Sequence, residues 1–139
     1  MDVLARLSNE HDTLLPLIVD IQSAAESSDN ATLVVRLKAG RAALTSELDA
    51  HIALEEEFAF ALIEKTLGQE LVAPFRSEHN EIRMLRDEVL AGADASSVAI
   101  GLCLQLCDLI QAHMQREDAV LFPSAHHALD PHSLEMPSQ

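Results

Sequence analysis

Four stretches of this sequence place apolar side chains at intervals of three, four or seven residues, which is the spacing of one face of an α-helix. The stretches cover about residues 2–26, 31–66, 70–91 and 96–122. Short connections join them, and short connections between long helices make neighbouring helices antiparallel. The pattern therefore predicts an all-α chain that folds as an up-down-up-down antiparallel four-helix bundle.

Signals for helix starts and stops stand at the ends of these stretches. Asp29 or Asn30 can cap the second helix, and Gly68 suits its C-terminal end. Pro123 is expected to end the fourth helix, because proline cannot donate the next backbone hydrogen bond. Residues 126–139 show no helical period, which predicts a short C-terminal tail that is loosely docked or disordered. We expect one domain over residues 1–125, with no internal repeat.

Composition narrows the classes of partner. The chain has 139 residues and a formal net charge of −14, which repels nucleic acid and anionic lipid. It has no apolar run near the roughly 20 residues that span a bilayer, and no basic start followed by an apolar stretch. We expect a cytoplasmic protein, monomeric or weakly self-associating, that binds neither nucleic acid nor membrane.

Polar residues interrupt the apolar faces of all four predicted helices. The interrupting residues are His11, His51, Glu55, His79, His113 and Glu117. Two pairs have an H-x-x-x-E spacing, which places an imidazole and a carboxylate one helical turn apart on the same face. At 1.5 Å per residue, His11 and His51 differ in level by only about 6 Å along the bundle, and His79 and His113 by about 9 Å. The six side chains can therefore meet on the bundle axis.

Four imidazoles and two carboxylates form a set of ligands suited to redox-active first-row metals. Calcium and magnesium prefer oxygen ligands alone, and structural zinc usually takes a closed site rich in Cys. Burying two carboxylates without a partner would cost several kcal/mol each, so a cation explains their position. A single histidine on an apolar face is a core residue about as often as it is a metal ligand. The six together favour two iron ions bridged by both carboxylates, although zinc or manganese can occupy such a site.

The residues around these positions resemble the hemerythrin-like, HHE-type cation-binding domains. The matching segments are NEHDTLLPLI, HIALEEEFAFALI, FRSEHNEIRML and HMQREDAVLFP, and the resemblance spans about residues 3–123. It implies that the four histidines are terminal ligands of two iron ions. It also implies that Glu55 and Glu117 bridge the ions and that an oxo or hydroxo group from solvent completes the bridge.

The sequence departs from the oxygen-carrying hemerythrins at one position. Those proteins have a fifth histidine, four residues from another on the third helix, whereas this chain has Phe75 and Arg83 at those distances from His79. Glu78 and Glu81 project to other sides of the helix, and the chain contains no Tyr. An open coordination position favours reaction with peroxide, nitric oxide or oxygen over reversible oxygen carriage.

Several other polar residues have simpler explanations. Glu56, Glu57 and Asp118 adjoin the proposed ligands and are expected to be solvated or to accept hydrogen bonds from them. Cys103 and Cys107 are expected to be reduced and partly buried. The tail residues His126, His127 and His132 are expected to be exposed to solvent.

Three functions remain open from the sequence. The first is a di-iron protein that handles small oxidants or gases, with peroxide breakdown as its enzymatic form. The second is an iron or oxygen sensor, or a storage module, without turnover. The third is a structural bundle in which the six residues form a metal-free polar network.

Overall fold

The computed structural model describes residues 1–136, and these residues are almost entirely helical. In chain order the elements are α1 (Val3–Glu26), α2 (Asn30–Ala39), the π-helical η1 (Ala43–Glu47), α3 (Leu48–Leu54), the π-helical η2 (Glu55–Ala59), α4 (Phe60–Leu67), α5 (Gln69–Asp94), α6 (Ile100–Arg116), the π-helical η3 (Glu117–Leu121), α7 (Phe122–Ala128) and α8 (Pro131–Leu134). The described residues contain no strand, only an isolated bridge between Asp2 and Glu135. The predicted all-α class is confirmed.

Local sequence explains where the helices begin and end. The side chain of Asp2 accepts hydrogen bonds from the backbone N–H groups of Leu4 and Ala5 at the start of α1. Asp29 accepts one from Thr32 at the start of α2, as predicted. Gly68 separates α4 from α5 with a φ of 101°, a backbone conformation that favours glycine.

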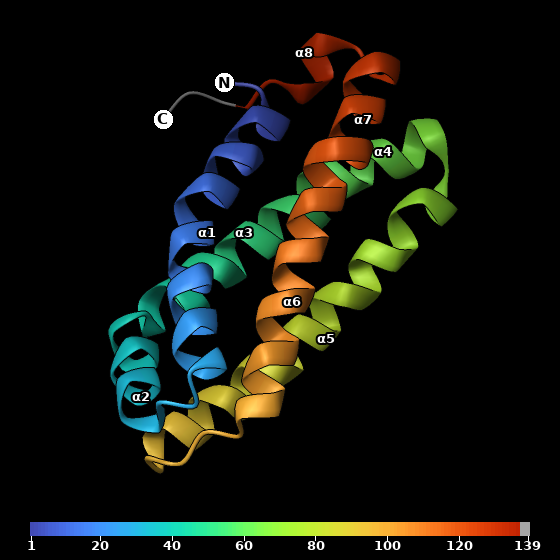
Figure 1. The fold of residues 1–139 in the computed structure, drawn as a ribbon. Helices are drawn as coiled ribbons and strands as arrows, with labels where there is room; N and C mark the ends of the chain where they lie inside the picture. The colour runs from blue at the N-terminus through green and yellow to red at the C-terminus, as the bar shows by residue number, and fades with distance from the viewer. Residues whose placement is uncertain (137–139) are drawn as a thin grey trace.

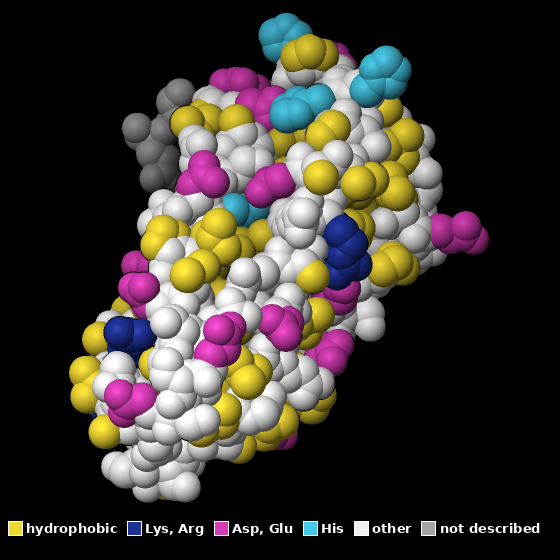
Figure 2. Space-filling view, viewed as in Figure 1, with side chains coloured by type: hydrophobic (Ala, Val, Ile, Leu, Met, Phe, Trp, Pro, Cys, Tyr) yellow, Lys and Arg dark blue, Asp and Glu magenta, His cyan; other side chains and the backbone are white. Residues whose placement is uncertain are grey.

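The helical segments pack side by side along most of their length (Figure 1). The α1 helix contacts α6 and α2, and α5 contacts α6, α4 and α2. Figure 2 shows acidic side chains spread over one face, with few basic ones among them, as the charge of −14 requires. No helix in the described part of the chain is both long and apolar enough to cross a membrane.

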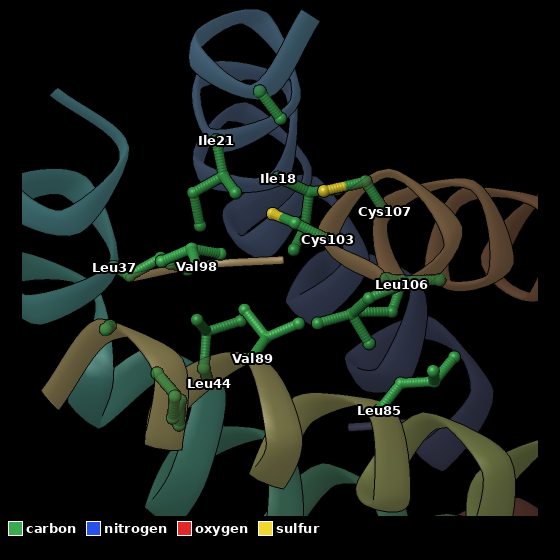
Figure 3. Packing of buried hydrophobic residues seen from close by; sticks show 14 of the residues in the cluster. Ile18, Ile21, Leu37, Leu44, Leu85, Val89, Val98, Cys103, Leu106 and Cys107 are labelled. Carbon is green, nitrogen blue, oxygen red and sulfur yellow. The ribbon is translucent and has the colours of Figure 1, made fainter. Parts of the chain in front are cut away.

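The buried apolar side chains form two separate clusters. The first includes Ile18, Leu44, Ile82 and Leu106, and Figure 3 shows part of it, with Cys103 and Cys107 of α6 near Ile18 of α1. Both cysteines are buried and free, as expected. The second cluster lies nearer the chain ends and is built from Leu4, Leu7, Phe60, Ile63, Val72, Phe75, Leu121 and Phe122, among others. Each long helical run contributes side chains to both clusters, and the six polar residues lie near the boundary between the two clusters.

The predicted end of the fourth helix at Pro123 is wrong. Pro123 lies in the first turn of α7, and the helix continues to Ala128. In the preceding segment, η3, the backbone bonds reach five residues back, and the N–H of Phe122 donates to the carbonyl of Glu117. This change in the hydrogen-bond pattern occurs directly before Pro123, which has no backbone N–H to donate. The helix therefore continues past the proline.

Residues 126–136 also differ from the loose tail expected from the sequence. Leu129 and Leu134 are buried in the second apolar cluster. The backbone N–H of Met136 donates to the carbonyl of Met1, and the N-terminal ammonium pairs with Glu135. These contacts hold the described part of the C-terminal segment against the start of α1. Residues 137–139 lie outside the described residues.

Candidate metal centre

All six polar residues singled out in the sequence converge between the two apolar clusters. They form two groups that could each hold a metal ion: His11, His51, Glu55 and Glu117, and then Glu55, His79, His113 and Glu117. Within each group the ligand atoms lie within 4.8 Å of one another. The two glutamates belong to both groups and are fully buried. Both groups that could hold a metal ion therefore contain the same two glutamates.

Each of the four imidazoles is held by a carboxylate on its outer nitrogen. The Nδ1 atoms of His11 and His79 lie 2.9 Å from Asp118 and 2.7 Å from Glu56. Those of His51 and His113 lie 2.8 Å from Glu10 and 2.9 Å from Glu78. A carboxylate accepts the hydrogen on Nδ1, so Nε2 is the ring nitrogen that faces into the site. Each imidazole can therefore bind a metal through Nε2 once that nitrogen carries no proton.

These four outer carboxylates were only partly predicted. Glu56 and Asp118 accept hydrogen bonds from the proposed ligands, which was one of the two roles expected for them, and Glu57 is exposed. Glu10 and Glu78 were missed as hydrogen-bond partners. Each directly precedes a histidine of the site, so a Glu-His dipeptide occurs twice. That repetition was the available signal, in a chain where acidic residues are common.

Several buried atoms at the centre lack a hydrogen-bond partner. They are Oε2 of Glu55, both carboxylate oxygens of Glu117 and Nε2 of His113. In addition, the Nε2 atoms of His11 and His51 lie 3.2 Å apart. Two nitrogens that bind one ion at about 2.1 Å each lie at about this separation. Buried acceptors that lack donors fit a cation, and so the residues present fit the metal centre that their types predict.

Among the histidines and glutamates of the centre, pKa values are shifted in both directions. Burial opposes a charge on His51 and His113, but the attraction of the neighbouring carboxylates outweighs it and raises their pKa to about 9 and about 10. Burial also opposes charge on Glu55, yet hydrogen bonding holds its pKa well below the usual range. Burial and repulsion from Glu55 raise the pKa of Glu117. A metal ion must therefore displace protons from this cluster in order to bind.

Both shared carboxylates stand at the start of a π-helical segment. Glu55 begins η2 and Glu117 begins η3. The wider π turn keeps residues five apart on one face, so Phe60 and Phe122 follow the glutamates into the interior. Phe60 stacks on His79 with ring centroids 5.4 Å apart, and Phe122 stacks on His11 at 6.0 Å. The π turns thus place an apolar wall behind one imidazole of each group.

The position of the missing fifth histidine is filled by an apolar ring. Phe75 is buried, and its centroid lies 5.5 Å from that of His113 in an edge-on arrangement. Arg83 turns away and donates to the side chain of Asn80. Among the described residues, no further His, Cys, Asp or Glu joins either ligand group. Each group therefore offers two imidazoles and the two shared carboxylates.

A small cavity adjoins the centre on the side of the first apolar cluster. Its lining includes His51, His79, Leu14, Leu48 and Ile110, and the centre of a water-sized molecule can move through about 20 Å³ within it. That volume accommodates about one water molecule. Two larger surface grooves, of about 410 and 450 Å³, both have His11 in their walls, and Leu14 and Leu48 line the first groove as well as the cavity.

The histidines of the C-terminal segment do not join this centre. His126, His127 and His132 are exposed, as expected, and His126 pairs with Asp2. Figure 2 shows histidine side chains gathered at the end of the molecule formed by α7 and α8.

The sequence model of one protein family, the hemerythrin HHE cation binding domain, matches residues 2–125. The chain belongs to this family. The match covers both ligand groups and all four outer carboxylates, and it confirms the resemblance seen in the sequence motifs. No curated protein and no solved structure matches the chain closely enough to count as a relative. The chain is thus a hemerythrin-like cation-binding domain whose His and Glu groups could hold metal.

Proposed function

We propose that this hemerythrin-like domain is a non-haem di-iron protein that binds or reacts with small oxidants or gases, such as oxygen, peroxide or nitric oxide. His11 and His51 would hold one iron, His79 and His113 the other, and Glu55 and Glu117 would bridge them. The observation that carries the proposal is the pair of ligand groups that share both buried glutamates, each with its ligand atoms within 4.8 Å of one another. A metal-free polar network leaves the orphaned oxygens of Glu117 unexplained.

The proposed fold is an antiparallel up-down-up-down bundle that the four long helical runs form within residues 1–125. We expect the protein to be cytoplasmic. In that arrangement each run contributes one histidine to the centre. The apolar clusters on both sides keep bulk water away from the bridging carboxylates, which strengthens their interaction with a cation.

Two bridged iron ions supply redox chemistry towards oxygen, peroxide and nitric oxide. The outer carboxylates orient the imidazoles through Nδ1, and the chain leaves a cavity large enough for one small molecule. Phe75 adds no fifth imidazole, so coordination positions stay open to exchange. This favours reaction, with peroxide breakdown as the enzymatic form, over simple oxygen carriage.

A sensor or storage module without turnover is the second candidate. One observation favours it: the two ligand groups draw on α1, the α3–η2 run, α5 and the α6–η3 run, so metal occupancy would couple all four to one another. A partner could then read the presence of iron as a change in stability.

Iron content tests the di-iron proposal directly. Protein reconstituted anaerobically with ferrous iron and freed of excess metal should retain about two iron ions per chain, as judged by elemental analysis. The variant His113→Ala should retain far less, whereas His126→Ala, which changes an exposed histidine, should match the unaltered protein. Fewer than about one iron per chain in the unaltered protein, or equal losses in both variants, would sink the proposal.

Oxygen evolution from peroxide separates the two candidates. An enzyme should show turnover that depends on bound iron and that fails in Glu117→Ala. If the iron-loaded protein shows no turnover, the sensor or storage role is favoured.

A further inference from the structure

The candidate metal centre is built from the same pattern of residues twice along the chain. The pattern begins with a Glu-His dipeptide on one helical run. The next long helical run carries H-x-x-x-E, then an acidic residue directly after that glutamate, and then a phenylalanine four positions after the acidic residue. The pattern consists of Glu10, His11, His51, Glu55, Glu56 and Phe60 in the first half, and of Glu78, His79, His113, Glu117, Asp118 and Phe122 in the second. This repeat was not expected from the sequence, because the surrounding residues differ.

The backbone repeats along with these residues. Glu55 and Glu117 each begin a five-residue π-helical segment. Outside glycine, the two residues with positive φ within residues 1–136 are Ser28, at 53°, and Ser96, at 57°. These serines are separated along the chain by the same number of residues as His11 and His79. The two halves therefore share turn geometry as well as ligand pattern.

The imidazoles of the two halves have nearly the same geometry. The ring centroids of His11 and His51 are 4.9 Å apart with the planes at 52°, and those of His79 and His113 are 4.8 Å apart at 54°. His11 is stacked on the phenylalanine of the second half at an interplanar angle of 12°, and His79 on that of the first half at 7°.

The hydrogen bonds of the outer carboxylates also correspond between the two halves. The acid that precedes the first histidine of each half holds the second histidine of the same half: Glu10 holds His51, and Glu78 holds His113. The acid that follows each shared glutamate holds a histidine of the other half, so Glu56 pairs with His79 and Asp118 with His11. If the first half of the chain is exchanged with the second, each of these four contacts takes the place of another of the four.

We propose that the two metal positions are equivalent, and that the outer carboxylates are positioning residues that act in two matched pairs, Glu10 with Glu78 and Glu56 with Asp118. Each ion would take two imidazoles from one half of the chain and share Glu55 and Glu117 with the other ion. The inference rests on the proposed dinuclear site. It implies that an incoming small molecule meets two ions with one donor set. The surroundings still distinguish them, since His79 is fully buried whereas His11 borders both surface grooves, and the Phe75 ring borders His113.

Mössbauer spectroscopy of protein loaded with ⁵⁷Fe and oxidised tests equivalence without any substitution. Equivalent ions should give one quadrupole doublet, whereas ions with different donor sets should give two doublets of equal area. Two iron ions per chain with two doublets in the unaltered protein would overturn the inference and leave the di-iron proposal standing. Fewer than two iron ions per chain would overturn both.

Matched variants test the positioning role. Glu10→Gln and Glu78→Gln remove one negative charge each, while the amide oxygen can still accept the hydrogen on Nδ1. Each should keep two iron ions and split the doublet into two of equal area, and the two variants should give the same spectrum. The control Glu57→Gln changes an exposed acid that holds no histidine and should leave a single doublet. If one variant splits the signal and its mate does not, or if the control splits it equally, the paired role is wrong.

Discussion

Glu10 accepts a hydrogen bond from Nδ1 of His51 at 2.8 Å, although the two residues come from different helices and Glu10 is partly open to solvent. Because that bond engages Nδ1 of the imidazole, Nε2 of His51 is the nitrogen that faces Nε2 of His11, 3.2 Å away. The outer carboxylate thus directs Nε2 to the place that a cation would occupy. The buried carboxylate of Glu117, whose oxygens lack hydrogen-bond partners, makes the centre a source of instability in the metal-free protein.

Glu117→Gln should therefore change stability in opposite directions with and without metal. The Glu117 carboxylate is fully buried beside Glu55, and its oxygens lack hydrogen-bond donors. In the metal-free protein an amide removes a buried charge and can donate to a histidine lone pair, which should stabilise the fold by about 1–2 kcal/mol. In the iron-loaded protein the loss of a bridging carboxylate should lower Tm. Thermal melts with and without chelator measure both effects.

A control distinguishes this effect from a general benefit of lower charge. Glu57→Gln removes one charge from the surface of the same acidic protein and should move neither melt by more than about 0.5 kcal/mol. Metal-free Glu117→Gln less stable than the unaltered protein would count against the buried-charge account.

Leu48→Ala should speed access to the centre. Leu48 lines both the internal cavity and the adjoining surface groove, as Leu14 and His51 do, so its side chain is part of the wall of each. Truncation should cost about 2–4 kcal/mol of stability and raise the rate at which azide or peroxide changes the visible spectrum of the iron-loaded protein several-fold. Leu85→Ala is the matched control, because Leu85 is equally buried in the same cluster but does not line the cavity. Equal rates in the two variants would show that access does not pass Leu48.

The sequence predicted the six central residues because a polar side chain on an apolar helical face is a strong departure from the period. His79 and Glu117, both wholly buried, stand out in this way. Glu10 and Glu78 did not, because they lie at the rim of the buried face, where acids are ordinary in a chain of charge −14. The helix end at Pro123 was placed wrongly because apolar spacing does not show that a π turn precedes the proline.

The C-terminal segment shows a different limit. Leu129 and Leu134 flank a proline and have no helical period to mark them, yet both are buried against the second apolar cluster. Leu134→Ala should lower the free energy of unfolding by about 2–3 kcal/mol, measured by chemical denaturation, while iron per chain stays unchanged. Val120→Ala, at a side chain that is 57% exposed, should change stability little. If Leu134→Ala unfolds at the same denaturant concentration as Val120→Ala, the segment contributes nothing to stability.

Phe75→His tests whether the missing fifth histidine decides reactivity. A histidine at this position lies one helical turn before His79 on the same face, and the native ring already borders His113. An added imidazole should occupy an open position on one ion. The variant should keep two iron ions, show a changed visible spectrum and react with peroxide at least about tenfold more slowly, because exchange at that ion is blocked. Phe75→Leu removes the ring without adding a donor and should react at nearly the native rate. A slow reaction in both variants would mean that the apolar wall of Phe75, rather than the open position, controls reactivity.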